Sequence, residues 1–126
     1  MTTVPKQCDV AVIGGGPAGS MAAALLSQKG YEVVLFEKKK QPRYNVGESL
    51  IPHFWKYCEL GKVADKIEEE GFIQKAGGTV VWNGVIRQIA FKNFGYSRPA
   101  LHVERDRFDH ILLRSEERRV GKECRL

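Results

Sequence analysis

Apolar residues near the start of the chain form two short runs on either side of a segment of small residues. Short uninterrupted apolar runs are typical of buried strands, above all in parallel sheets covered on both faces. We therefore predict a strand at residues 9–13, a helix at residues 18–28 that ends before Gly30, and a second strand at residues 32–36. This order of elements indicates an α/β fold.

The pattern beyond residue 40 predicts a series of shorter elements. In chain order these are a loop at 41–50, helices at 53–60 and 63–70, strands at 79–82 and 85–91, an extended segment at 100–103 and a helix at 106–113. Pro52 suits the first turn of the helix that follows it, and Gly71 would end the next one. The Asn83-Gly84 pair between two predicted strands is a strong signal for a β-hairpin.

The turn after the first predicted strand has the spacing G-x-G-x-x-G, at Gly14, Gly16 and Gly19. In a dinucleotide-binding unit the first glycine allows the tight turn, and the second lets the backbone approach a pyrophosphate. The third lets the helix pack closely on the strand. The start of the helix, at Pro17 and Ala18, would direct a partial positive charge and unpaired N–H groups at the phosphates.

An acidic residue, Glu37, ends the second predicted strand at the distance expected for an acceptor of hydrogen bonds from a ribose diol. The lysine run that begins at Lys38 could meet a ribose 2′-phosphate, but such a run is more often a solvated turn, and Glu37 would repel the phosphate. We keep Lys38 among the candidate cofactor-binding residues. The alternative to this whole interpretation is a glycine-rich loop in an unrelated α/β protein.

The charge and the cysteine content exclude several kinds of function and binding partner. The chain has 20 Lys and Arg against 15 Asp and Glu, a net charge of +5, but residues 114–126 hold part of that excess, so we expect no nucleic-acid partner. The three cysteines form no C-x-x-C pair and suggest neither a metal site nor disulfides. No apolar run is long enough for a membrane span, and no secretory signal is visible. We therefore expect a cytoplasmic protein.

Two further segments resemble flavin-dependent halogenases, which belong to the FAD-dependent aromatic monooxygenase-like flavoproteins. They are Gly47-Glu48-Ser49-Leu50-Ile51-Pro52 and the stretch 72–78 that leads to Trp82-Asn83-Gly84. The segment 103–109, with the leucines that follow it, is similar to a pattern found across that class. The resemblance spans about residues 9–113. It implies a Rossmann-like FAD/NAD(P)-binding fold, of which this is the N-terminal part, with a small β-hairpin insertion.

The resemblance also implies FAD as the cofactor and assigns roles to matching residues. The ADP half of FAD would lie against Gly14, Gly16, Gly19 and Glu37. The flavin would lie near Arg43, Gly47, Glu48 and Ser49, and Arg105 would also contact FAD. Lys75 would be the halogenase lysine, which takes up or hydrogen-bonds hypohalous acid and presents it to the substrate. Lysine suits that task because burial readily lowers its pKa. Spacing alone is better explained by an exposed lysine beside a glycine pair.

The implied activity is halogenation of an aromatic or electron-rich small molecule, with reduced FAD, oxygen and halide, and with a separate flavin reductase as a possible partner. Two other enzyme classes on the same fold stay open: a FAD-dependent hydroxylase that uses NAD(P)H directly, and a geranylgeranyl-reductase-like flavoprotein. A non-enzymatic alternative is a truncated nucleotide-binding module. The W-x-W-x-I-P segment of these halogenases does not occur in the chain.

Residues 114–126 differ in character from the rest of the chain. The hydrophobic period stops at Leu113, and the segment from Arg114 to Cys124 resembles the in-frame translation of a sequencing adapter. We therefore predict that residues 1–113 are the N-terminal part of a FAD-binding domain and that residues 114–126 are an artefactual tail. A charged, solvated end of the last helix is the alternative.

Overall fold

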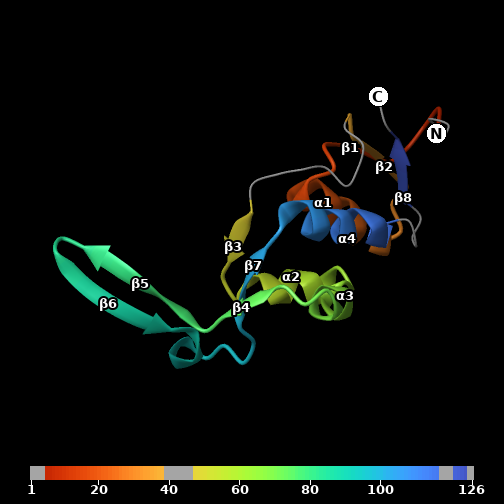
Figure 1. Ribbon diagram of the computed structural model, residues 1–126. Helices are drawn as coiled ribbons and strands as arrows, with labels where there is room; N and C mark the ends of the chain where they lie inside the picture. The colour runs from red at the N-terminus through yellow and green to blue at the C-terminus, as the bar shows by residue number, and fades with distance from the viewer. Residues whose placement is uncertain (1–4, 39–46, 117–120, 125–126) are drawn as a thin grey trace.

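A computed structural model describes residues 5–38, 47–116 and 121–124 (Figure 1). Its elements, in chain order, are β1 (Val10–Ile13), α1 (Pro17–Gln28), β2 (Val33–Phe36), β3 (Glu48–Leu50), α2 (Phe54–Leu60), α3 (Ala64–Glu69), β4 (Ile73–Lys75), β5 (Gly77–Trp82), β6 (Val85–Ala90), a 3-10 turn (Phe91–Phe94), β7 (Ala100–Val103), α4 (Arg105–Glu116) and β8 (Gly121–Cys124). Within these ranges no helix is long and apolar enough to cross a membrane.

The predicted strand–helix–strand unit at the start of the chain is confirmed. Strands β1 and β2 pair in parallel, in the sheet order β1-β2-β8, and α1 connects them. Helix α1 ends where predicted, because Gly30 takes a φ of +91° and its N–H donates to the Ser27 carbonyl oxygen. The N–H of Tyr31 also donates to the Leu26 carbonyl oxygen, so the helix ends in a Schellman motif.

The second sheet corrects one prediction. Residues 48–50, predicted as part of a loop, form β3, which pairs antiparallel with β7. Strand β4 pairs with the other edge of β7, so the sheet order is β3-β7-β4. A three-residue strand has almost no periodicity of its own, so its partner rather than its sequence makes it a strand.

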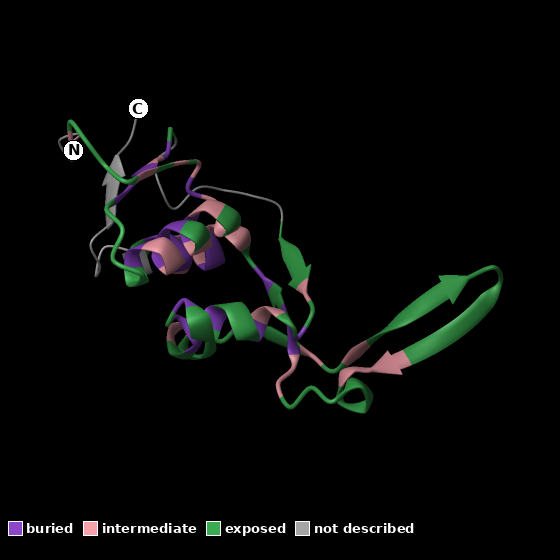
Figure 2. Ribbon diagram, turned by 180° about the vertical axis from the view of Figure 1, so that it is seen from behind, coloured by how far each residue is buried: buried purple, intermediate pink, exposed green. Residues whose placement is uncertain are grey.

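Helix α4 contributes side chains to both hydrophobic cores of the molecule. Its residues Phe108 and Leu112 lie in a core formed with α2, α3 and β7, while Leu113 lies in a second core beneath β2. Both α1 and α4 lie on one side of the first sheet and pack against each other (Figures 1 and 2). The predicted helix at 106–113 is thus confirmed, and it extends to Glu116.

The predicted hairpin is confirmed and projects away from the rest of the molecule (Figure 2). Asn83 and Gly84 both have positive φ, 49° and 74°, as a two-residue turn between twisted strands requires. Apolar side chains on the hairpin are exposed, with Trp82 at 74 %.

The structure places Gly121–Cys124 as a strand, β8, parallel to β2. Almost any sequence can pair through its backbone groups. The presence of β8 therefore does not test where residues 114–126 come from. The artefactual tail stays a prediction.

Candidate functional site

The glycine turn between β1 and α1 has the close contacts predicted for it. Gly14 has a φ of +104°, and its N–H donates to the Phe36 carbonyl oxygen at 2.8 Å, which ties the turn to the end of β2. A Cβ on Gly19 would lie 1.9 Å from the Gly14 carbonyl oxygen, so only glycine fits there. The first and third glycines therefore act within the fold, as helix–strand packing requires.

The middle glycine, Gly16, faces open space. A Cβ built on it would meet no atom within 4 Å, and as the N-cap of α1 it has no side chain that could accept a hydrogen bond from the first N–H groups of the helix. The first N–H groups of a helix have no partner within the helix, and Pro17 at its first position has no N–H to satisfy. The turn therefore leaves room, and a helix N-terminus, for an anionic group such as a pyrophosphate.

Glu37, the predicted acceptor for a ribose diol, lies buried against the glycine turn. Its side chain is 4 % exposed, and its Oε2 accepts a hydrogen bond from the Gly15 N–H at 2.7 Å. A Cβ on Gly15 would lie 3.1 Å from the same oxygen, so the carboxylate closes against the turn. Glu37 therefore anchors the glycine turn to β2, and its contact with a ribose stays a prediction.

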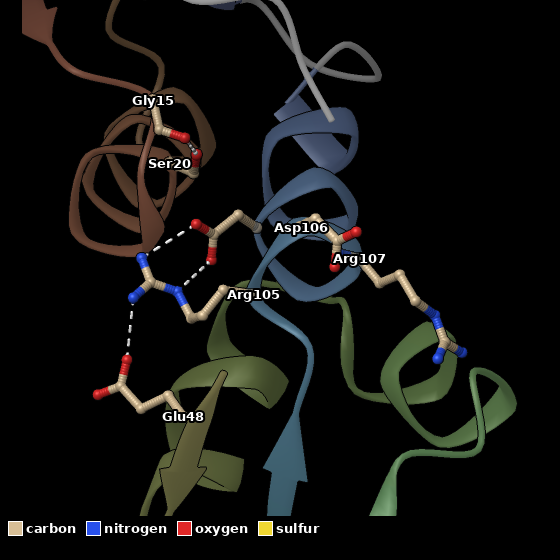
Figure 3. A network of polar contacts seen from close by, with 7 residues as sticks. Gly15, Ser20, Glu48, Arg105, Asp106 and Arg107 are labelled. Carbon is tan, nitrogen blue, oxygen red and sulfur yellow. Dashed lines mark hydrogen bonds and ion pairs between the residues drawn. The ribbon is translucent and has the colours of Figure 1, made fainter. Parts of the chain in front are cut away.

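A second group of candidate residues gathers where β3 meets the start of α4. Arg105 donates two hydrogen bonds to Asp109, at 2.8 and 3.0 Å, and one to Glu48 at 3.0 Å (Figure 3). The pKa of Arg105 is raised, first by its hydrogen bond to Asp109 and also by both negative charges. Asp109 is 1 % exposed, so the pair between it and Arg105 is a buried anchor for β3 through Glu48.

The candidate catalytic residue Lys75 lies at the end of β4, and its Nζ donates a hydrogen bond to Ser49 Oγ on β3. The two residues are 26 positions apart in sequence, and they belong to the two segments that resemble halogenases. His102, which pairs with Ser49 across β3 and β7, lies on the same face of the sheet. The site brings together a cation, a hydroxyl and an imidazole on one exposed sheet face.

The remaining candidates are placed as follows. Ala18 and Lys38 are exposed, at the start of α1 and just after β2. Gly47 is also exposed, immediately before β3. Arg43 lies outside the described residues. No contact in the described part of the chain joins Lys75 to the glycine turn.

Sequence reasoning missed three residues of these groups. Gly15 was overlooked because it is a variable position of the glycine motif. Asp109 was not singled out, although its position four residues after Arg105 on a helix is a detectable signal for an ion pair. His102 has no acid–base partner visible in the sequence, and only the register of β3 and β7 places it beside Ser49.

The parallel β1-α1-β2 unit with its glycine turn, followed by a small second sheet, defines the class: the N-terminal part of a Rossmann-like FAD-binding fold. The family model for tryptophan halogenases matches residues 9–125. The chain therefore belongs to the tryptophan halogenase family.

Individual relatives agree with this assignment. The flavin-dependent halogenase armH1 of Armillaria mellea is 40 % identical over 114 residues, which are 88 % of this chain and 22 % of that protein. The tryptophan 2-halogenase of Chondromyces crocatus is 39 % identical over 115 residues, or 91 % of this chain and 22 % of its own. The chain thus spans about a fifth of the length of these curated relatives.

The solved structure of the myxobacterial chondrochloren halogenase CndH, a variant of the FAD-dependent halogenases, superposes with a TM-score of 0.85. It is 34 % identical, and the match covers 96 % of this chain and 29 % of that one. The fold predicted from the sequence is therefore confirmed.

Proposed function

We propose that this chain is the N-terminal segment of a FAD-dependent halogenase that acts on an aromatic or other electron-rich small molecule. The observation that carries the proposal is the hydrogen bond between Lys75 and Ser49, because it joins the two most specific halogenase-like segments at one point. Halide and oxygen are the other reactants, and a separate flavin reductase supplies reduced FAD.

The glycine turn has the free space and the exposed helix N-terminus that the pyrophosphate of FAD needs, at Gly16 to Ala18. Gly14 and Gly19 shape the turn, Glu37 holds it to β2, and Lys38 and Arg43 belong to the segment that follows. Gly47, Glu48 and Ser49 form the approach to the flavin, and Arg105 holds Glu48 by an ion pair. FAD, when bound, supplies the oxygen activation that no protein side chain provides.

Lys75 is the proposed catalytic residue. A lysine ammonium offers three donors and one compact charge, which suits the orientation of a small polar oxidant such as hypohalous acid. The neighbouring hydroxyl limits where that ammonium can lie. The protein's part in the chemistry is therefore to place the oxidant against the substrate and to exclude water.

The test is Lys75→Ala in the full-length protein that contains this segment, with Lys56→Ala as the control, because Lys56 is an exposed lysine on α2. We expect Lys75→Ala to abolish halogenated product while oxidation of reduced FAD continues, and Lys56→Ala to change neither. Halogenation that persists in Lys75→Ala would contradict the assignment and favour a hydroxylase or a reductase on the same fold.

Two broader proposals accompany this one. The location is cytoplasmic, supported by two free cysteines among the described residues, Cys8 and Cys58, since reducing compartments keep thiols free. Residues 1–113 are the N-terminal part of a larger domain, supported by the short share of the relatives covered and by the 80 % exposure of Ile13 on β1. In a complete doubly wound sheet the first strand lies in the middle, whereas β1 lies at the edge of the sheet that the structure describes.

A further inference from the structure

The exposed face of the second sheet is organised around Ser49. In the antiparallel register Ser49 lies opposite His102, and Lys75 lies opposite Ala100, two residues earlier on β7. Residues that lie opposite each other on paired strands share a face of the sheet, and so do residues two positions apart on one strand. Ser49, His102 and Lys75 therefore all lie on the same face. The Lys75 side chain reaches across β7 to β3, since its Nζ donates to Ser49 Oγ, and the residue of β7 opposite Lys75, Ala100, carries only a methyl group.

Strand β3 is fixed on its other face. Glu48 precedes Ser49, and successive strand residues point to opposite faces. Its carboxylate accepts the hydrogen bond from Arg105, which the buried Asp109 holds in place. The Ser49 hydroxyl is therefore presented by a strand that is paired with β7 along one edge and anchored by an ion pair beneath it.

A lysine side chain has four rotatable carbons and loses its orientation readily when exposed. We propose that Ser49 is a positioning residue for Lys75: its hydroxyl accepts a hydrogen bond from the ammonium and holds it over the exposed face of the second sheet. This inference rests on the proposed function, which makes Lys75 the catalytic residue. It gives Ser49 a role beyond contact with the flavin.

The test measures the reactivity of the Lys75 amine without flavin, halide or substrate. The full-length protein is treated with an amine-acetylating reagent at fixed pH, and the modification rate of Lys75 is read by peptide mass spectrometry against Lys56 as internal reference. We expect Ser49→Ala to raise the Lys75 rate about three- to tenfold, the effect of losing one partly exposed hydrogen bond. Ser49→Thr, which keeps the hydroxyl, should restore the wild-type rate.

An unchanged Lys75 rate in Ser49→Ala overturns the inference. If that variant does not fold, Ser49→Val and Ser49→Thr form a second pair of equal shape that differs only in the hydroxyl. Equal rates in this pair overturn the inference too. Failure of the proposed function is a separate result: it is halogenation by Lys75→Ala, and it leaves the labelling comparison intact.

Discussion

Alanine substitutions at two glycines of the same turn should separate protein stability from FAD binding. Gly19→Ala should lower stability, and Gly16→Ala should lower the affinity for FAD. A Cβ at position 19 would lie 1.9 Å from the Gly14 carbonyl oxygen, whereas tight but tolerable Cβ contacts are above 3.0 Å. The helix or the turn must therefore move by more than an ångström. Both are backbone, so no flexible side chain can absorb the shift. Overpacking of this kind costs about 3 kcal/mol, which in a full-length protein of the relatives' size is a fall in Tm of about 3 °C.

The matched control is Gly16→Ala, three residues earlier in the turn. Gly16 has an ordinary φ of −75°, and its added methyl group would meet nothing within 4 Å. We expect its Tm to stay within about 0.5 °C of the wild type, since a substitution without strain changes stability little. If a pyrophosphate approaches this position, however, the methyl group will weaken binding of FAD by about tenfold or more, through steric overlap.

The assay is thermal unfolding by circular dichroism, together with FAD binding followed by flavin fluorescence, on both variants of the full-length protein. Gly19→Ala should lose stability, while Gly16→Ala should lose affinity alone. An equal loss of stability in both variants would refute the packing argument. Unchanged FAD affinity in Gly16→Ala would refute the placement of the pyrophosphate.

Three other predictions concern buried groups. Burial raises the pKa of the Cys58 thiol to about 12, so alkylation of the native protein at pH 8 should modify the exposed Cys8 and spare Cys58; equal modification would contradict this. Because the unfolded chain ionises this thiol from about pH 9, the free energy of unfolding should fall as pH rises from about 9 to 12. Asp109→Asn should lower the free energy of unfolding by about 2 kcal/mol in urea titrations, since Arg105 loses its buried counter-charge, and an unchanged midpoint would count against that anchor.

The elements that the sequence predicted correctly depend on local rules. Apolar runs with a glycine turn between them predict β1, α1 and β2, and Asn83-Gly84 predicts the hairpin, because each signal acts on residues a few positions apart. The spacing of the glycines likewise indicated that Gly19 packs against backbone and that Gly16 faces open space. Family resemblance, rather than spacing, singled out Lys75.

Only the tertiary structure decided the features that join distant segments. Residues 48–50 become a strand because β7, more than fifty residues later, offers them backbone partners, and Ser49 then meets Lys75. Glu37 turns inward because the Gly15 N–H lies within its reach. Hydrophobic periodicity reports which face of an element is buried, but it contains no information on which other element covers that face. Pairing across the chain therefore had to come from the fold.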